Sequence, residues 1–299
     1  INVTAVARIA SPTIGTAAVS SSETLREIRP HVISIGNDGA LDPRGDIGTT
    51  LGSVREILDV DFPRITEKWN KKRIVVYAHG GLVSQASAIE TVAGYRQTLL
   101  DAECYPLAFI WKTDYWTTLS NMLADAARRR RPEGVLDATK DFMLDRLDDA
   151  LEPIARLLTG KSEWDEMKKN ALLATVSAEG GARVVAEGLA VLAKQGVDIH
   201  LVGHSAGSIF LAPLVQYLVS KGAMNSGPMA GSKVDGLGAT VASCHLWAPA
   251  CTVKLFQETY LEPIRDKRIG QFGLFTLTDQ AERDDNCAHV YNKSLLYLV

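Results

Sequence analysis

The most constraining feature of the sequence is a glycine-flanked turn between two uncharged segments. Residues 198–202 (DIHLV) have the composition of a buried strand, and Gly203-His204-Ser205-Ala206-Gly207 follows directly. Residues 201–220 contain no Lys, Arg, Asp or Glu, but their polar residues and Pro213 argue against a membrane span. The pattern therefore predicts a strand, a tight turn and a buried helix.

The segments around this turn alternate between strand and helix. Residues 73–78 (RIVVYA) and 105–111 (YPLAFIW) are continuous β-prone runs, which are typical of central strands in parallel sheets. A helix is predicted between them over residues 85–102. Further strands are predicted at 31–35, 240–247 and 273–278, and further helices at 50–70, 182–194 and 255–264. The sequence predicts an α/β fold with a mostly parallel central sheet flanked by helices.

The same pattern suggests three regions. Residues 1–70 are predicted to be an N-terminal arm, rich in Ala, Ser and Thr at its start, followed by a helix packed on the core. Residues 71–113 and 176–299 are predicted to form the α/β core. Residues 114–175 contain no convincing strand, and their apolar residues recur at helical spacing, so they are predicted to be a helical insertion.

Composition excludes several classes of protein. The 299 residues carry a net charge of -3, whereas a nucleic-acid-binding protein normally has a basic face. The four cysteines form no CxxC pair and are interpreted as free thiols. The sequence has no metal-ligand spacing, P-loop or G-x-G-x-x-G motif. We therefore predict no metal, no cofactor and no nucleic-acid partner.

The turn at residues 203–207 has the G-x-S-x-G spacing of a nucleophilic serine. The flanking glycines lack a Cβ that would clash with the strand and the helix, and the tight turn would lift the Ser205 hydroxyl above the sheet. There the helix N-terminus favours a developing negative charge. A second glycine turn, Ala78-His79-Gly80-Gly81-Leu82, follows the strand at 73–78.

On these two turns, GHSAG at 203–207 and AHGGL at 78–82, the chain resembles the α/β-hydrolase superfamily in its lipase and esterase branch. It is also similar to uncharacterised bacterial α/β-hydrolases in the YAHGGL segment and the YxKSLLYLV ending. The resemblance implies an oxyanion hole made by the N–H groups of Ala206 and Gly81, or of Gly80 or Leu82 beside it. It implies that the helical insertion at 114–175 is a lid. It also implies that His79 fixes its own loop.

The resemblance also implies a chain order of serine, acid and histidine. Asp279, directly after the predicted strand at 273–278, is the predicted acid, with Asp284 and Asp285 as alternates. His289 is the predicted base, although it follows Asp279 more closely than the family pattern does. The alternative is a base beyond residue 299. His245, inside a predicted strand, is interpreted as a core histidine.

These residues predict a serine hydrolase that cleaves a carboxylic ester through an acyl-enzyme on Ser205. The apolar residues of the predicted lid favour acyl or lipid-like substrates. One alternative is a catalytically silent relative used for binding or assembly. Another is a membrane-surface phospholipase whose four arginines at 128–131 face anionic lipid. A cytoplasmic location is expected, and the oligomeric state is left open.

Overall fold

A six-stranded parallel sheet forms the centre of the computed structural model, which describes residues 22–81, 83–111 and 161–283. The strand order is β1-β3-β2-β4-β7-β8, and every pairing is parallel. The bounds are β1 Val32–Ile35, β2 Arg73–Ala78, β3 Tyr105–Trp111, β4 Asp198–His204, β7 Val241–Trp247 and β8 Ile269–Phe275. All six carboxyl ends therefore meet at one edge of the sheet, and the predicted α/β architecture is confirmed.

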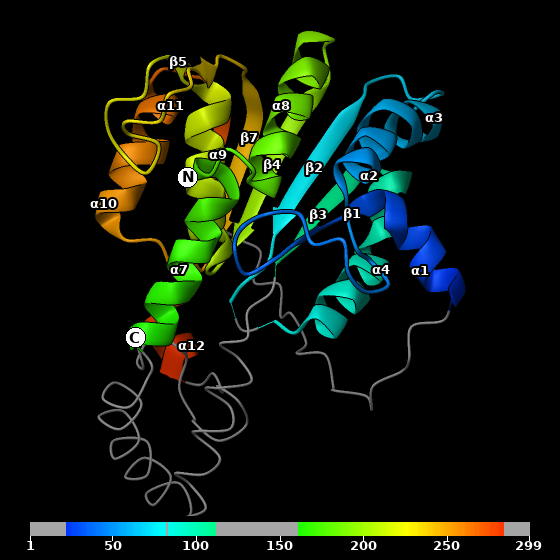
Figure 1. Cartoon of the computed structure of the whole chain (residues 1–299), viewed down its shortest axis with the longest axis horizontal. Coiled ribbons are helices and arrows are strands. Elements are labelled where there is room, and N and C mark those ends of the chain that lie inside the picture. Colours follow the sequence, from blue (N-terminus) through cyan, green and yellow to red (C-terminus); the bar gives the residue numbers. More distant parts are fainter. Residues whose placement is uncertain (1–21, 82, 112–160, 284–299) are drawn as a thin grey trace, which may run out of the picture.

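Helices connect the strands, as long parallel crossovers require. They are α1 Ser22–Ile28, α2 Leu51–Arg55, α3 Phe62–Ile65, α4 Gln85–Asp101, α7 Lys161–Val176, α8 Gly181–Lys194, α9 Gly207–Val219, α10 Val253–Phe256, α11 Glu262–Arg265 and α12 Asp279–Arg283. Short 3₁₀ and π turns (η1 Arg29–His31, η2 Glu56–Asp61, η5 Gln257–Leu261) join some of them, and the two-residue strands β5 (Lys221–Gly222) and β6 (Gly236–Leu237) pair separately. Figure 1 shows α8 and α9 on one side of the sheet and α1 and α4 on the other.

One side of the sheet, here called the closed face, is buried along the central strands β2 and β4. Along β2 and β4 it carries Ile74, Val76, Ile199 and Leu201, each at most 1% exposed. The helices α8 and α9 pack against it, and α9 is buried along its whole length. This layer supports the turn that follows β4.

The opposite side of β2, β4, β7 and β8, here called the open face, is only partly covered. It carries Val75, Tyr77, His200, Val202, Ser243, His245 and Trp247, because side chains alternate along each strand and paired positions share a face. The helices α1 and α4 cover the neighbouring strands with a second apolar cluster that includes Ile28, Val92 and Ile110. Trp247 and Phe275, at the ends of β7 and β8, remain 44% and 57% exposed.

Three elements differ from the sequence predictions. Residues 22–28 form α1, with Ile28 fully buried, where an arm was predicted. The helix predicted over 50–70 is divided into α2, η2 and α3. The strand predicted at 273–278 is β8, which begins earlier and ends at Phe275, because Ile269 pairs with Val241.

Most of the predicted insertion at 114–175 lies outside the described residues. Its last part forms α7, which buries Met167, Ala171 and Ala174 in the main core against α8 and α9. Within the described ranges, no helix is long and apolar enough to cross a membrane.

Candidate active site

Ser205 lies in the turn between β4 and α9, at the carboxyl edge of the sheet. Its φ is +50°, a left-handed conformation that residues other than glycine rarely adopt. Such strain costs about 1–3 kcal/mol and persists only where the surroundings enforce it. Here the Ser205 N–H donates to the Trp247 carbonyl at 2.8 Å, and the Ser205 carbonyl accepts from the Ala250 N–H at 3.1 Å. The loop after β7 therefore holds the turn at both ends.

The two flanking glycines are required by close backbone contacts. A Cβ on Gly207 would lie 2.0 Å from the carbonyl oxygen of Ala78, and a Cβ on Gly203 would lie 3.1 Å from the Gly207 carbonyl carbon. The start of α9 thus passes directly over the end of β2. This explains the G-x-S-x-G spacing physically, and it places the helix N-terminus beside Ser205.

The second glycine turn lies against the first. A Cβ on Gly80 would be 3.2 Å from the Ser205 Cβ, and one on Gly81 would be 3.3 Å from the Ala206 Cβ. The structure therefore brings Gly80, Gly81 and Ala206 together beside Ser205. Among the hydrogen bonds of the described residues, none uses the N–H of Gly81 or Ala206. Within the described part of the chain, neither N–H therefore has an acceptor.

His79 stabilises this second turn through hydrogen bonds of its ring. Its Nε2 accepts from the Trp111 N–H at 3.3 Å, so the proton resides on Nδ1, which donates to the Gly80 carbonyl at 2.7 Å. The Trp111 indole Nε1 donates to the His79 carbonyl, and the two rings stack. Burial lowers the pKa of His79 to about 4. Both ring nitrogens are occupied, which supports the structural role that the resemblance implies for this histidine.

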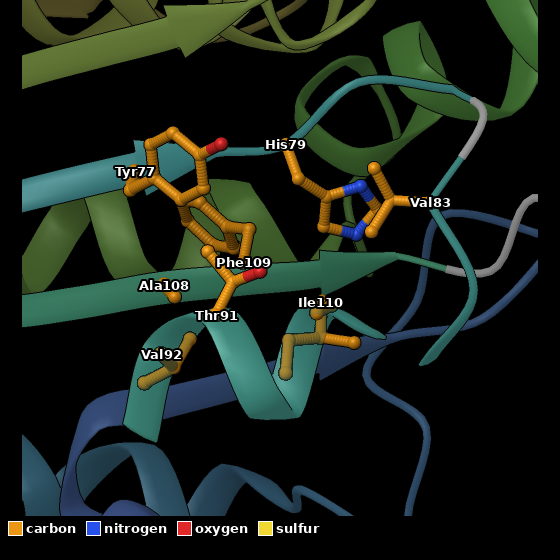
Figure 2. A pocket seen from close by; sticks show the side chains of 9 residues that line it. Tyr77, His79, Val83, Thr91, Val92, Ala108, Phe109 and Ile110 are labelled. Atoms are coloured by element: carbon orange, nitrogen blue, oxygen red, sulfur yellow. The ribbon is translucent and has the colours of Figure 1, made fainter. Parts of the chain in front are cut away.

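A small cavity of about 30 Å³ lies next to His79, between β2, β3 and α4. Figure 2 shows the His79 ring pointing toward Val83, with the Ile110 side chain below it. The space suffices for about one or two water molecules. It is too small for a substrate.

Asp279, the predicted acid, is the first residue of α12 and not the last of a strand. Its carboxylate pairs with Arg283 at 3.0 Å, and both side chains are mostly exposed. The position is close in sequence to the carboxyl end of β8, at the same edge as Ser205. Asp284, Asp285 and His289 lie outside the described residues.

The other histidines have separate environments. His200 lies on β4 with its Nδ1 2.8 Å from the Ser243 Oγ, and His245 lies inside β7 with its ring near Phe275. His204 ends β4, and burial lowers its pKa. Among the described residues, no side chain is hydrogen-bonded to the Ser205 hydroxyl. The predicted acid–base pair is therefore not assembled within the described part of the chain.

Sequence reasoning missed the residues that support the turn from α9 and η5. The Ser208 Oγ donates to the Ser205 carbonyl at 2.7 Å and accepts from the Cys251 N–H at 3.1 Å. The Tyr260 hydroxyl donates to the Ser208 carbonyl at 2.6 Å. Tyr260 is far from Ser208 in the sequence and no local pattern marks it, so only the folded chain reveals this support.

The described residues contain no group of three or more His, Cys, Asp or Glu side chains placed to hold a metal ion. Comparisons of the chain with protein-family models, with curated proteins and with solved structures found no match. The geometry at Ser205 is thus the basis for a functional interpretation.

Proposed function

We propose that this protein is a serine hydrolase that cleaves carboxylic esters through an acyl-enzyme on Ser205. The observation that carries the proposal is the strained backbone of Ser205, held at the N-terminus of α9 beside two N–H groups that have no acceptor among the described residues. A glycine would adopt this backbone conformation without strain. A serine kept there at a cost is typical of a functional site.

The chemistry follows from this arrangement. The Ser205 Oγ attacks the ester carbonyl carbon while a histidine accepts its proton, and the N–H groups of Ala206 and Gly81 stabilise the oxyanion. The histidine returns the proton to the leaving alkoxide, and water then hydrolyses the acyl-enzyme by the same route. Each oxyanion donor of this kind typically contributes about 10²–10³ in rate. From the sequence, His289 is the proposed base and Asp279 its orienting acid.

The test is labelling of the full chain with a fluorophosphonate, mapped by mass spectrometry. We expect modification at Ser205 and none in Ser205→Ala. Ser243→Ala is the matched control: Ser243 is already paired with His200, but it lies in regular strand β7 without oxyanion donors. Labelling should survive this change. If His289 is the base, His289→Ala should slow labelling by about 10²–10⁴.

The result also separates the alternatives. A folded protein that resists labelling would contradict the hydrolase proposal and favour the catalytically silent relative. Labelling at Ser243 instead of Ser205 would show that a histidine contact, and not the strained turn, creates reactivity. The phospholipase alternative depends on residues 128–131, which lie outside the described residues.

A further inference from the structure

The turn formed by Gly80 and Gly81 needs support from outside, because glycine has no side chain to restrain its own backbone. One support is His79, whose Nδ1–H donates to the Gly80 carbonyl at 2.7 Å. That carbonyl and the Gly81 N–H belong to one planar trans peptide unit, so they point in opposite directions. The hydrogen bond therefore directs the Gly81 N–H, but it leaves the Gly81 Cα unrestrained.

The second support is Met167, a residue of α7. A Cβ on Gly81 would lie 2.5 Å from the Met167 Sδ and 3.3 Å from the Met167 Cε. The end of the methionine therefore occupies the space that a side chain on Gly81 would need, in van der Waals contact with the glycine. The same Cβ position is 3.3 Å from the Ala206 Cβ. Met167 thus packs where Gly81 and Ala206, the two proposed oxyanion donors, lie against each other.

The packing of α7 fixes the position of this methionine. Met167, Ala171 and Ala174 have i, i+4, i+7 spacing, which places them on one face of the helix, and each is at most 4% exposed. The small alanines permit close backbone contacts, since a Cβ on Gly39 would lie 2.5 Å from the Ala174 nitrogen. The helix also packs against α8 and α9. Of the buried residues that the structure describes in α7, which include Thr175, only Met167 has a long side chain.

We propose that Met167 is a positioning residue for the oxyanion donor at Gly81, an inference that rests on the proposed function. The thioether is apolar and only a weak hydrogen-bond acceptor, so it restrains the backbone without competing for the N–H groups of Gly81 and Ala206. Because Met167 is buried, it also covers this part of the turn against water. A donor that is already oriented in a site with little water stabilises a developing negative charge better than one that must reorient.

The first test compares the truncation of two buried methionines in the full chain. Met167→Ala removes the contact with Gly81. Met224→Ala is the matched control, because Met224 is 5% exposed in the same apolar cluster and follows the end of α9 that is opposite to Ser205. Both changes should lower the urea midpoint of unfolding by similar amounts, since both leave a cavity in the core.

Hydrolysis of p-nitrophenyl acetate then distinguishes the two variants. In Met167→Ala we expect kcat to fall about tenfold and KM to stay within about twofold, because a misplaced donor weakens mainly the transition state. Met224→Ala should keep the kcat of the parent protein. Met167→Leu restores most of the apolar volume and should recover kcat to within about threefold.

A second measurement does not depend on hydrolysis. In protein with isotope-labelled glycine, the NMR order parameter of the Gly81 amide reports how rigidly its N–H is held on the picosecond to nanosecond timescale. We expect a value of about 0.85, typical of rigid backbone, in the parent protein and in Met224→Ala. In Met167→Ala it should fall below about 0.6, and Met167→Leu should restore it.

The outcomes keep the two proposals separate. If kcat and the Gly81 order parameter of Met167→Ala equal those of Met224→Ala, the methionine only fills space and the positioning role is overturned. A raised KM with an unchanged kcat would overturn it too, because Met167 would then contact the substrate. If the parent protein neither hydrolyses the ester nor reacts with the fluorophosphonate, the proposed function fails. An order parameter that falls only in Met167→Ala would still support the restraint of the Gly81 N–H by Met167.

Discussion

The two faces of the central sheet differ although they are made by the same strands. On β2, Val76 is fully buried on the closed face, whereas its neighbour Val75 on the open face is half-buried. Among the described elements, α8 and α9 pack against the closed face, whereas α1 and α4 cover only part of the other side.

The hydrogen bonding of polar groups also differs between the two faces. Around the closed face, Ser208 and Tyr260 are joined in a chain of hydrogen bonds that ends at the Ser205 carbonyl. On the open face, His200 and His245 each keep a ring nitrogen without a partner among the described residues. A fully satisfied network gives rigidity. The strained turn is therefore supported from the closed side.

The largest expected effect comes from adding one methyl group where the closed layer meets the sheet. Gly207→Ala should cost about 3 kcal/mol or more, because the new Cβ would meet the Ala78 carbonyl at 2.0 Å. Gly94→Ala, in α4, meets nothing within 4 Å and should stabilise by about 0.5–1 kcal/mol. Urea unfolding followed by circular dichroism measures both. Similar unfolding free energies for Gly207→Ala and Gly94→Ala would contradict the difference between the tightly packed α9 and the less crowded α4.

Acid should weaken the molecule through its buried histidines. Burial lowers the pKa of His31 and of His79 to about 4, against about 6.5 in the unfolded chain. Between these values the unfolded chain binds protons that the folded protein excludes, so stability is complete above about pH 6.5, falls as the pH drops from 6.5 to 4 and levels off below 4. The loss is up to roughly 3 kcal/mol for each histidine.

Urea unfolding at several pH values between 7 and 4 measures this loss. His31→Phe is the informative variant, because it keeps a ring against Tyr105 but cannot titrate. We expect the free energy of unfolding of this variant to depend less steeply on pH than that of the parent protein. The pH dependence that remains should come mainly from His79. An unchanged slope would show that His31 is not kept neutral by burial.

Part of this architecture could be predicted because local sequence patterns determine it. The bounds of β2 and β3 match the predicted strands at 73–78 and 105–111, since long apolar runs between turn residues have few other solutions. The turn at Ser205 was predictable because glycine spacing reflects steric limits. The positions of Gly80 and Gly81 beside it agree with the expectation from the resemblance.

Other features depend on contacts between distant segments and left no local signal. The end of β8 at Phe275 is set by pairing with β7, so Asp279 does not follow the strand directly and instead begins α12. A Cβ on Gly81 would lie only 2.5 Å from the Sδ of Met167 in α7. The sequence analysis had assigned the segment that contains Met167 to an insertion. The partial cover of the open face could not be predicted from the sequence. The alternation of side chains along a strand predicts which residues share a face, but not which elements cover that face.

The smallest effect comes from the most closely matched pair of residues, Val76 and Val75. Val76→Ala removes two methyl groups from a fully buried position and should cost about 2 kcal/mol. Val75→Ala, one residue earlier on the same strand, should cost under about 1 kcal/mol, because its side chain is only half-buried on the open face. Urea unfolding of the two variants gives both values. Equal costs would mean that the two faces bury these side chains alike in solution, and would contradict the difference between the faces.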